Sequence, residues 1–108
     1  MQSINFAKDV QWLKTNPALD HPRVLELVEK IATHIRLTMQ DESYFRFRKA
    51  EYHERSVGGQ SVLTRDGFPV EKTSDKKVVA AFCDDLRAGL LEEFEINIGT
   101  EAGSYPPW

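Results

Sequence analysis

Residues 20–39, DHPRVLELVEKIATHIRLTM, form the most strongly patterned stretch of the chain. Apolar residues recur there every three or four positions, the spacing of one face of an α-helix. They are Val24, Leu27, Val28, Ile31, Ile35 and Met39. Asp20 stands where an N-cap is expected, and Pro22 falls in the first turn, where its missing N–H costs little. The stretch therefore predicts a long helix with one buried face.

Two shorter segments carry the same helical spacing. Phe6, Val10 and Leu13 indicate a helix over residues 5–15, which Asn16-Pro17 ends because a residue before proline avoids helical geometry. A third helix is indicated by apolar residues at Val78, Val79, Phe82, Cys83, Leu86 and Leu90. Thr73 or Ser74 is its expected N-cap.

Extended structure is expected between the second and third helices and again after the third. Gly58-Gly59 separates residues 44–55 from residues 60–64, which favours a β-hairpin with one turn at the glycines. A short helix over residues 43–55 is the alternative, since its Lys, Arg, Ala and Glu content permits one. Residues 94–98 alternate apolar and polar side chains, as a half-buried strand does.

These segments predict an α+β domain with element order ααββαβ. Three helices would pack against a small, mainly antiparallel sheet in two layers. At 108 residues the chain has the length of one domain, which we place at residues 1–98. Residues 99–108 have no periodicity, and we expect a mobile tail there.

Composition narrows the class of protein. Hydrophobic residues make up 41% of the chain, enough for a packed core, yet no apolar run reaches the length of a membrane span. The start of the chain lacks the pattern of a secretion signal. Cys83 is the single cysteine, so we expect no disulfide and no zinc cluster, and its place among apolar residues favours a core position. We expect a soluble protein of the cytoplasm.

Charge is unevenly distributed along the chain. The net charge is −3, whereas a dedicated nucleic-acid-binding domain is usually strongly basic. Residues 73–108 hold 3 basic and 7 acidic side chains, so the acidic excess lies in the C-terminal third. Such a surface favours solubility and can steer a basic partner.

The segment from residue 44 to residue 55 is the most unusual in composition, because aromatic and basic side chains alternate there. As one continuous strand it would turn Phe45 and Phe47 toward the core. The opposite face would then carry arginines between tyrosines, a combination that pairs phosphates and stacks on exposed bases. The candidate ligand or partner surface consists of Tyr44, Arg46, Arg48, Tyr52 and Arg55.

No spacing of residues assigns a catalytic, metal or cofactor site. His21 lies in a helix start, His34 on the polar side of the second helix, and His53 in the hairpin without an assigned partner. A pair formed by Cys83 and His53 is an open alternative, since such partners meet in space rather than in sequence. The glycines and carboxylates lack the spacing of phosphate loops or calcium loops. We therefore expect no cofactor and no metal.

The function expected from these observations is binding of another protein by a small non-catalytic module: a regulator, inhibitor or assembly factor. An open sheet edge would also allow pairing into a homodimer. Tyr105 and Trp108 in the terminal Tyr-Pro-Pro-Trp are candidate tail anchors for a partner's groove. Nucleic-acid binding through residues 44–55 is the first alternative, and a small enzyme with an unrecognised site is the second.

Overall fold

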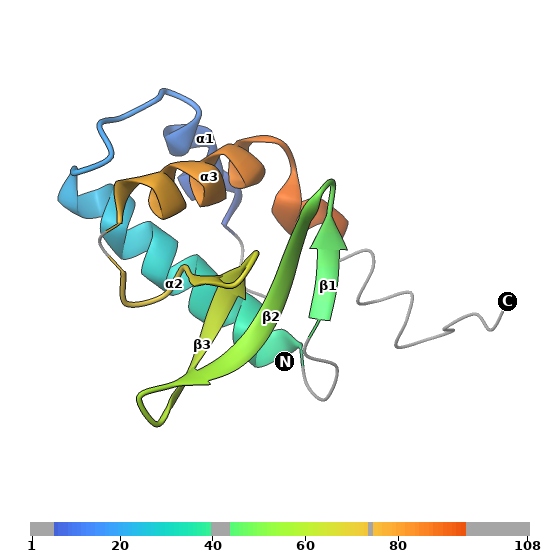
Figure 1. The fold of residues 1–108 in the computed structure, drawn as a ribbon. Coiled ribbons are helices and arrows are strands. Elements are labelled where there is room, and N and C mark those ends of the chain that lie inside the picture. Colours follow the sequence, from blue (N-terminus) through green and yellow to red (C-terminus); the bar gives the residue numbers. More distant parts are fainter. Residues whose placement is uncertain (1–5, 40–43, 74, 95–108) are drawn as a thin grey trace, which may run out of the picture.

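The computed structural model describes residues 6–39, 44–73 and 75–94 of the chain. Its elements are α1 (Ala7–Leu13), α2 (Pro22–Thr38), β1 (Tyr44–Phe47), β2 (Ala50–Val57), β3 (Gln60–Arg65), β4 (Phe68–Pro69) and α3 (Lys76–Arg87). Residues 90–94 are also helical. Figure 1 shows the helices together on one side of the sheet, so the described residues form two layers.

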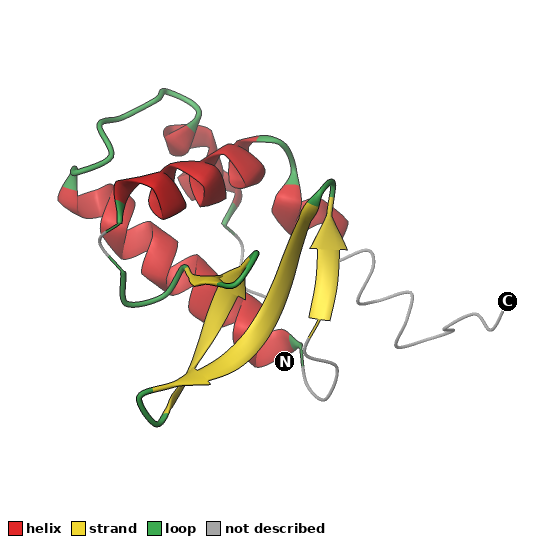
Figure 2. Ribbon diagram, viewed as in Figure 1, coloured by secondary structure: helices red, strands yellow, loops and turns green. Residues whose placement is uncertain are grey.

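The sheet is antiparallel throughout, with strand order β1-β2-β3-β4, and each strand pairs with its neighbours along the chain (Figure 2). The predicted mixed α+β class is confirmed. So is extended structure rather than a helix over residues 44–55. No helix in the described ranges is long and apolar enough to cross a bilayer.

The N-caps of α2 and α3 lie one or two residues after the residues expected from the sequence. His21, not Asp20, caps α2, and its Nδ1 accepts the N–H of Arg23 at 3.0 Å. Pro22 explains the difference, since proline is favoured at the first helical position and places the cap directly before it. In α3 the cap is Asp75, whose Oδ1 accepts the N–H of Lys77 at 2.9 Å, rather than Thr73; Ser74 lies outside the described residues.

The expected long strand over residues 44–55 is wrong in one important respect, because it is two strands joined by a tight turn. Arg48 and Lys49 form that turn, and Arg48 adopts a φ of 58°, a conformation more often given to glycine. Phe47 pairs with Ala50 and Phe45 pairs with Tyr52. Before the turn the odd-numbered residues point toward the core, and after it the even-numbered residues do. Tyr52 therefore lies on the core side with Phe45 and Phe47.

The expected strand over residues 94–98 is wrong at Phe94, the part of that range that the structure describes. Phe94 belongs to the helical stretch after α3, in which the N–H of Glu93 donates to the carbonyl of Gly89 at 3.0 Å. Leu90 and Phe94 are both fully buried, as helical positions four apart on one face should be. Residues 95–98, the tail and its candidate anchors Tyr105 and Trp108 lie outside the described residues.

The core lies between the helices and the inner face of the sheet. It includes the predicted apolar stripes of α2 and α3 and, as expected, Cys83. On the sheet side Tyr52 is 0% exposed, and its ring stacks on Phe45 with centroids 4.8 Å apart. Each large apolar side chain buried here stabilises the fold by about 1.5 to 3 kcal/mol.

A buried carboxylate joins α2 to β3. Glu71 is 1% exposed; its Oε1 accepts Arg36 Nε at 2.8 Å and the N–H of Leu63 at 2.7 Å, and its Oε2 accepts Thr33 Oγ1 at 2.6 Å. We call these four residues the Glu71 cluster. Burial alone would raise the pKa of the Glu71 carboxyl, but the hydrogen bonds from Arg36, Thr33 and Leu63 outweigh it and hold the pKa below its usual value.

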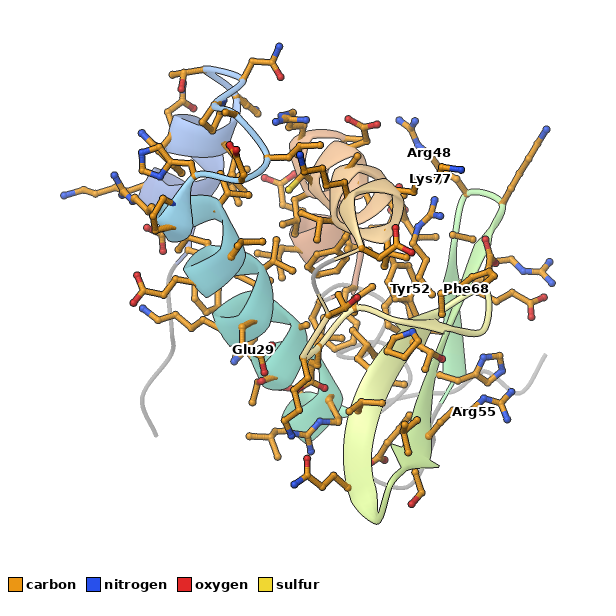
Figure 3. All side chains as sticks on the ribbon, turned by 60° about the vertical axis from the view of Figure 1, so that its left-hand side comes forward. Glu29, Arg48, Tyr52, Arg55, Phe68 and Lys77 are labelled. Atoms are coloured by element: carbon orange, nitrogen blue, oxygen red, sulfur yellow. The ribbon has the colours of Figure 1, made fainter. Side chains whose placement is uncertain are left out.

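The segment that follows is fastened to the same helix. The N–H of Lys72 donates to Glu29 Oε1 at 2.6 Å, and Lys72 Nζ donates to Gln60 Oε1 at 2.8 Å. Glu29 lies on α2, as Figure 3 shows. The connection from β4 to α3 is thus held against the helix layer, which sets the position of α3 relative to the β3–β4 turn.

Candidate functional site

The predicted ligand surface on residues 44–55 is not assembled. Tyr52 is a core residue, because the β1–β2 turn places it opposite Phe45 on the inner face of the sheet. Arg46 is exposed but bound to Glu51, with Nη2 2.6 Å from Oε2. Arg48 lies in the turn, its guanidinium 5.4 Å from the Phe47 ring, and Arg55 lies toward the far end of β2 (Figure 3). Tyr44 begins β1, and its side chain is outside what the structure describes.

The histidines and the cysteine have separate surroundings. His21 caps α2, and the ring of His34 meets the edge of Phe6 at 5.3 Å between centroids. His53 lies on β2. Cys83 is fully buried, and burial raises the pKa of its thiol, which disfavours the reactive thiolate. Within the described ranges, no three His, Cys, Asp or Glu side chains gather closely enough to hold a metal ion.

A second buried carboxylate lies between β2, β3 and α3. Asp85 is 7% exposed, and its Oδ2 accepts both the hydroxyl of Tyr52, in a short hydrogen bond, and Nε of Arg65 at 2.8 Å. We call these three residues the Asp85 cluster. Burial raises the pKa of the Tyr52 hydroxyl, and the bond to Asp85 raises it further, so the phenol stays protonated.

The Asp85 cluster lies beside a pocket. Its Arg65 also lines a hollow of about 250 Å³ between the β3–β4 turn and α3. From the turn come Arg65, Asp66 and Phe68; the loop before α3 gives Asp75, and α3 gives Lys77, Val78 and Ala81. The ion pair of Arg65 with Asp85 ties the two walls together, since Arg65 lies at the end of β3 and Asp85 on α3.

One wall of the pocket carries an exposed aromatic side chain. Phe68 is 61% exposed, whereas Val78 and Ala81 opposite are half-buried. Phe68 is the first residue of β4, directly after the β3–β4 turn, and Lys77 lies on α3 (Figure 3). Asp66-Gly67 explains why Phe68 is presented outward: both residues have positive φ, 52° and 90°, and form a tight turn that leaves the next side chain at the sheet's short edge strand.

Both acidic and basic groups line the pocket. On the turn side Asp66 Oδ2 lies 3.7 Å from Nη1 of Arg65, and Asp66 Oδ1 accepts the N–H of Glu51 at 3.0 Å. On the α3 side Asp75 uses one oxygen for the cap, and the ammonium of Lys77 forms no ion pair with any residue that the structure describes. The rim thus offers charges of both signs around an apolar interior.

Sequence reasoning did not single out this site. Arg65, Phe68 and Lys77 were not among the candidate site residues, which came from residues 44–55 and from the C-terminal tail. One signal was present: Asp85 lies among the apolar positions of α3, three residues after Phe82. A carboxylate on the buried face of a helix needs a partner from elsewhere in the fold.

Comparison of the chain with protein-family models, with curated proteins and with solved structures gives no match.

Proposed function

We propose that this chain is a small non-catalytic module of the cytoplasm that binds another protein, acting as a regulator, inhibitor or assembly factor. Its binding surface is the pocket between the β3–β4 turn and α3. The observation that carries the proposal is Phe68, a large apolar side chain that is 61% exposed at the mouth of a 250 Å³ hollow. Aromatic anchors and pockets at the centre of a polar rim are typical of protein interfaces.

The chemistry of the pocket supports binding rather than catalysis. Arg65 is committed to Asp85, and the Tyr52 hydroxyl donates to the same carboxylate, so these groups hold the walls together. A general acid or base has to reach a substrate with a pKa near the working pH, whereas the raised pKa of Tyr52 takes its hydroxyl away from that range.

Nucleic-acid binding through residues 44–55 gains no support from the geometry. Its stacking platform required Tyr52 at the surface, and its phosphate contacts required Arg46 without a carboxylate beside it. Tyr52 is buried and Arg46 is bound to Glu51. Arg48 in the β1–β2 turn and Arg55 toward the far end of β2 are two separated cations, which give a weak electrostatic footprint.

The test compares two exposed apolar residues. Phe68→Ala removes the proposed anchor, and Leu37→Ala removes a side chain that is 68% exposed on α2 and does not line the pocket. Tagged wild type and both variants are used to purify partners from the source cells, with quantitative mass spectrometry. We expect a protein retained by wild type and Leu37→Ala and lost with Phe68→Ala.

Binding of that protein is then measured with purified components. Loss of a central aromatic anchor costs about 2 kcal/mol or more, so the dissociation constant should rise at least about 30-fold for Phe68→Ala. Equal retention of every captured protein by the three forms would refute the pocket as the binding surface.

A further inference from the structure

The Phe68 surface combines a protrusion and a hollow. Phe68 stands out from the β3–β4 turn, and the space beside it is closed on the other side by Val78 and Ala81 of α3. The hollow measures about 250 Å³. A cavity of about 150 Å³ already accepts a benzene molecule. The space can therefore receive an aromatic ring of the size that the same surface presents.

The charges on the two walls are also matched. The turn side has Arg65 and Asp66, and the α3 side has Asp75 and Lys77. Each wall thus carries one acid and one base. A two-fold symmetric interface uses the same patch on both copies, so the patch has to complement itself in shape and in charge.

We propose that this surface binds a second copy of the chain in a two-fold symmetric dimer. The inference rests on the proposed function, because it names the partner of the same surface. A two-fold axis that runs along the pocket, between the turn and α3, places the turn of each copy over α3 of the other. Phe68 of each copy then packs on Val78 and Ala81 of the other.

The same axis pairs opposite charges. Asp66 on the turn of one copy comes over the α3 wall of the other, where Lys77 forms no ion pair within the described part of its own chain. This pairing forms twice, once on each side of the axis. Sheet pairing through an edge strand, the route to a dimer suggested by the sequence, is not needed for this contact.

The dimer is tested by sedimentation equilibrium of the purified chain over a range of concentrations. Wild type should move from one to two times the monomer mass as the concentration rises. Phe68→Ala should raise the dimer dissociation constant at least about 30-fold, and Lys77→Glu about tenfold. Two controls should stay within about twofold of wild type: Leu37→Ala, and Lys76→Glu, which makes the same charge change on the neighbouring exposed lysine outside the pocket.

The outcomes separate this inference from the proposed function. A wild type that stays monomeric to millimolar concentration overturns the dimer, and so does a dimer that all four variants weaken equally. If wild type is monomeric but Phe68→Ala loses a different protein in the purification, the binding function stands and the dimer falls. If the dimer depends on Phe68 and no other protein does, the dimer stands, and the protein that this surface binds is a second copy of the chain rather than a different protein.

Discussion

The Glu71 cluster and the Asp85 cluster contain the same kinds of group, a buried carboxylate held by an arginine and a hydroxyl, but they lie in different surroundings. Glu71 receives three donors, one of them a strand N–H, and is closed in by α2 and β3. Asp85 receives two donors on one oxygen, and its arginine lines an open pocket. The comparison shows that the same set of groups can close off one part of a small domain and, in another part, hold together the walls of an open pocket.

Removal of the first carboxylate should have the largest effect. Glu71→Ala leaves Arg36 with little exposure and no counter-charge from Glu71, and leaves the Leu63 N–H without its acceptor. Breaking a buried pair in this way costs about 3 to 5 kcal/mol in the free energy of unfolding. Urea denaturation followed by circular dichroism measures it.

Glu71→Gln is the matched control, because it keeps the size of the side chain and one acceptor oxygen. It should lose less than Glu71→Ala. A loss below about 1 kcal/mol for Glu71→Ala would mean that the cluster does not hold α2 to the sheet.

Removal of the second carboxylate should cost less. Asp85→Ala deprives Arg65 and the Tyr52 hydroxyl of their shared acceptor, but Arg65 lies at the pocket and can be hydrated. We expect a loss of about 2 to 3 kcal/mol, measured in the same urea titration. If Asp85→Ala proved as costly as Glu71→Ala, the difference in exposure between the clusters would not matter to stability.

Acid should weaken the Glu71 cluster. The folded pKa of Glu71 lies below the ordinary value of 4.5, so the unfolded chain binds a proton more readily than the folded one. The stabilisation is therefore complete above the ordinary pKa and is lost as the pH falls through the folded pKa. The stability difference between wild type and Glu71→Gln should shrink from about pH 6 to about pH 3, as urea titrations at each pH would reveal.

A smaller effect is expected from Tyr52→Phe, which deletes one hydroxyl and leaves the ring stacked on Phe45. Asp85 keeps its bond to Arg65, so the loss in unfolding free energy should be about 1 to 2 kcal/mol. Thermal unfolding compares the variant with wild type. An unchanged midpoint would show that the hydroxyl contributes nothing beyond the arginine.

The smallest change in stability is expected from Phe68→Ala, because the side chain is largely in solvent. Its free energy of unfolding, at a concentration that keeps wild type monomeric, should stay within about 0.5 kcal/mol of wild type. The same substitution is expected to have the largest effect on binding. A strong loss of stability would instead mark Phe68 as part of the fold.

The helices could be predicted because their signal is local. Residues spaced three and four apart in α2 and α3 face the core, except Val78, which lines the pocket, and the predicted fold class followed from this spacing. The turn between β2 and β3 could also be predicted from local sequence, because Gly58 and Gly59 both adopt the positive φ that a tight turn requires.

The β1–β2 turn could not be predicted, because Arg48 and Lys49 give no turn signal. Arg48 takes a positive φ without being glycine or asparagine, and the order of the surrounding sheet has to maintain that conformation. Because this turn was missed, Tyr52 was predicted on the exposed face of the sheet, and the predicted ligand surface was wrong for the same reason.

The candidate site was beyond prediction for a different reason. Its walls come from Phe68 at the sheet edge and from α3, and the bond that joins them links Arg65 to Asp85 across 20 residues. The Glu71 cluster spans still more sequence, since Thr33 and Glu71 are 38 positions apart. Contacts at such separations leave no periodic trace in one sequence.

The amide of Leu63 gives the Glu71 cluster a consequence for how the molecule opens. This N–H belongs to a central strand, yet its acceptor is a carboxylate that α2 also holds. An amide proton exchanges with solvent only when its hydrogen bond breaks. Exchange at Leu63 therefore requires its N–H and the Glu71 carboxylate to separate, so the exchange rate of this one proton reports how often the contact between β3 and the Glu71 cluster opens.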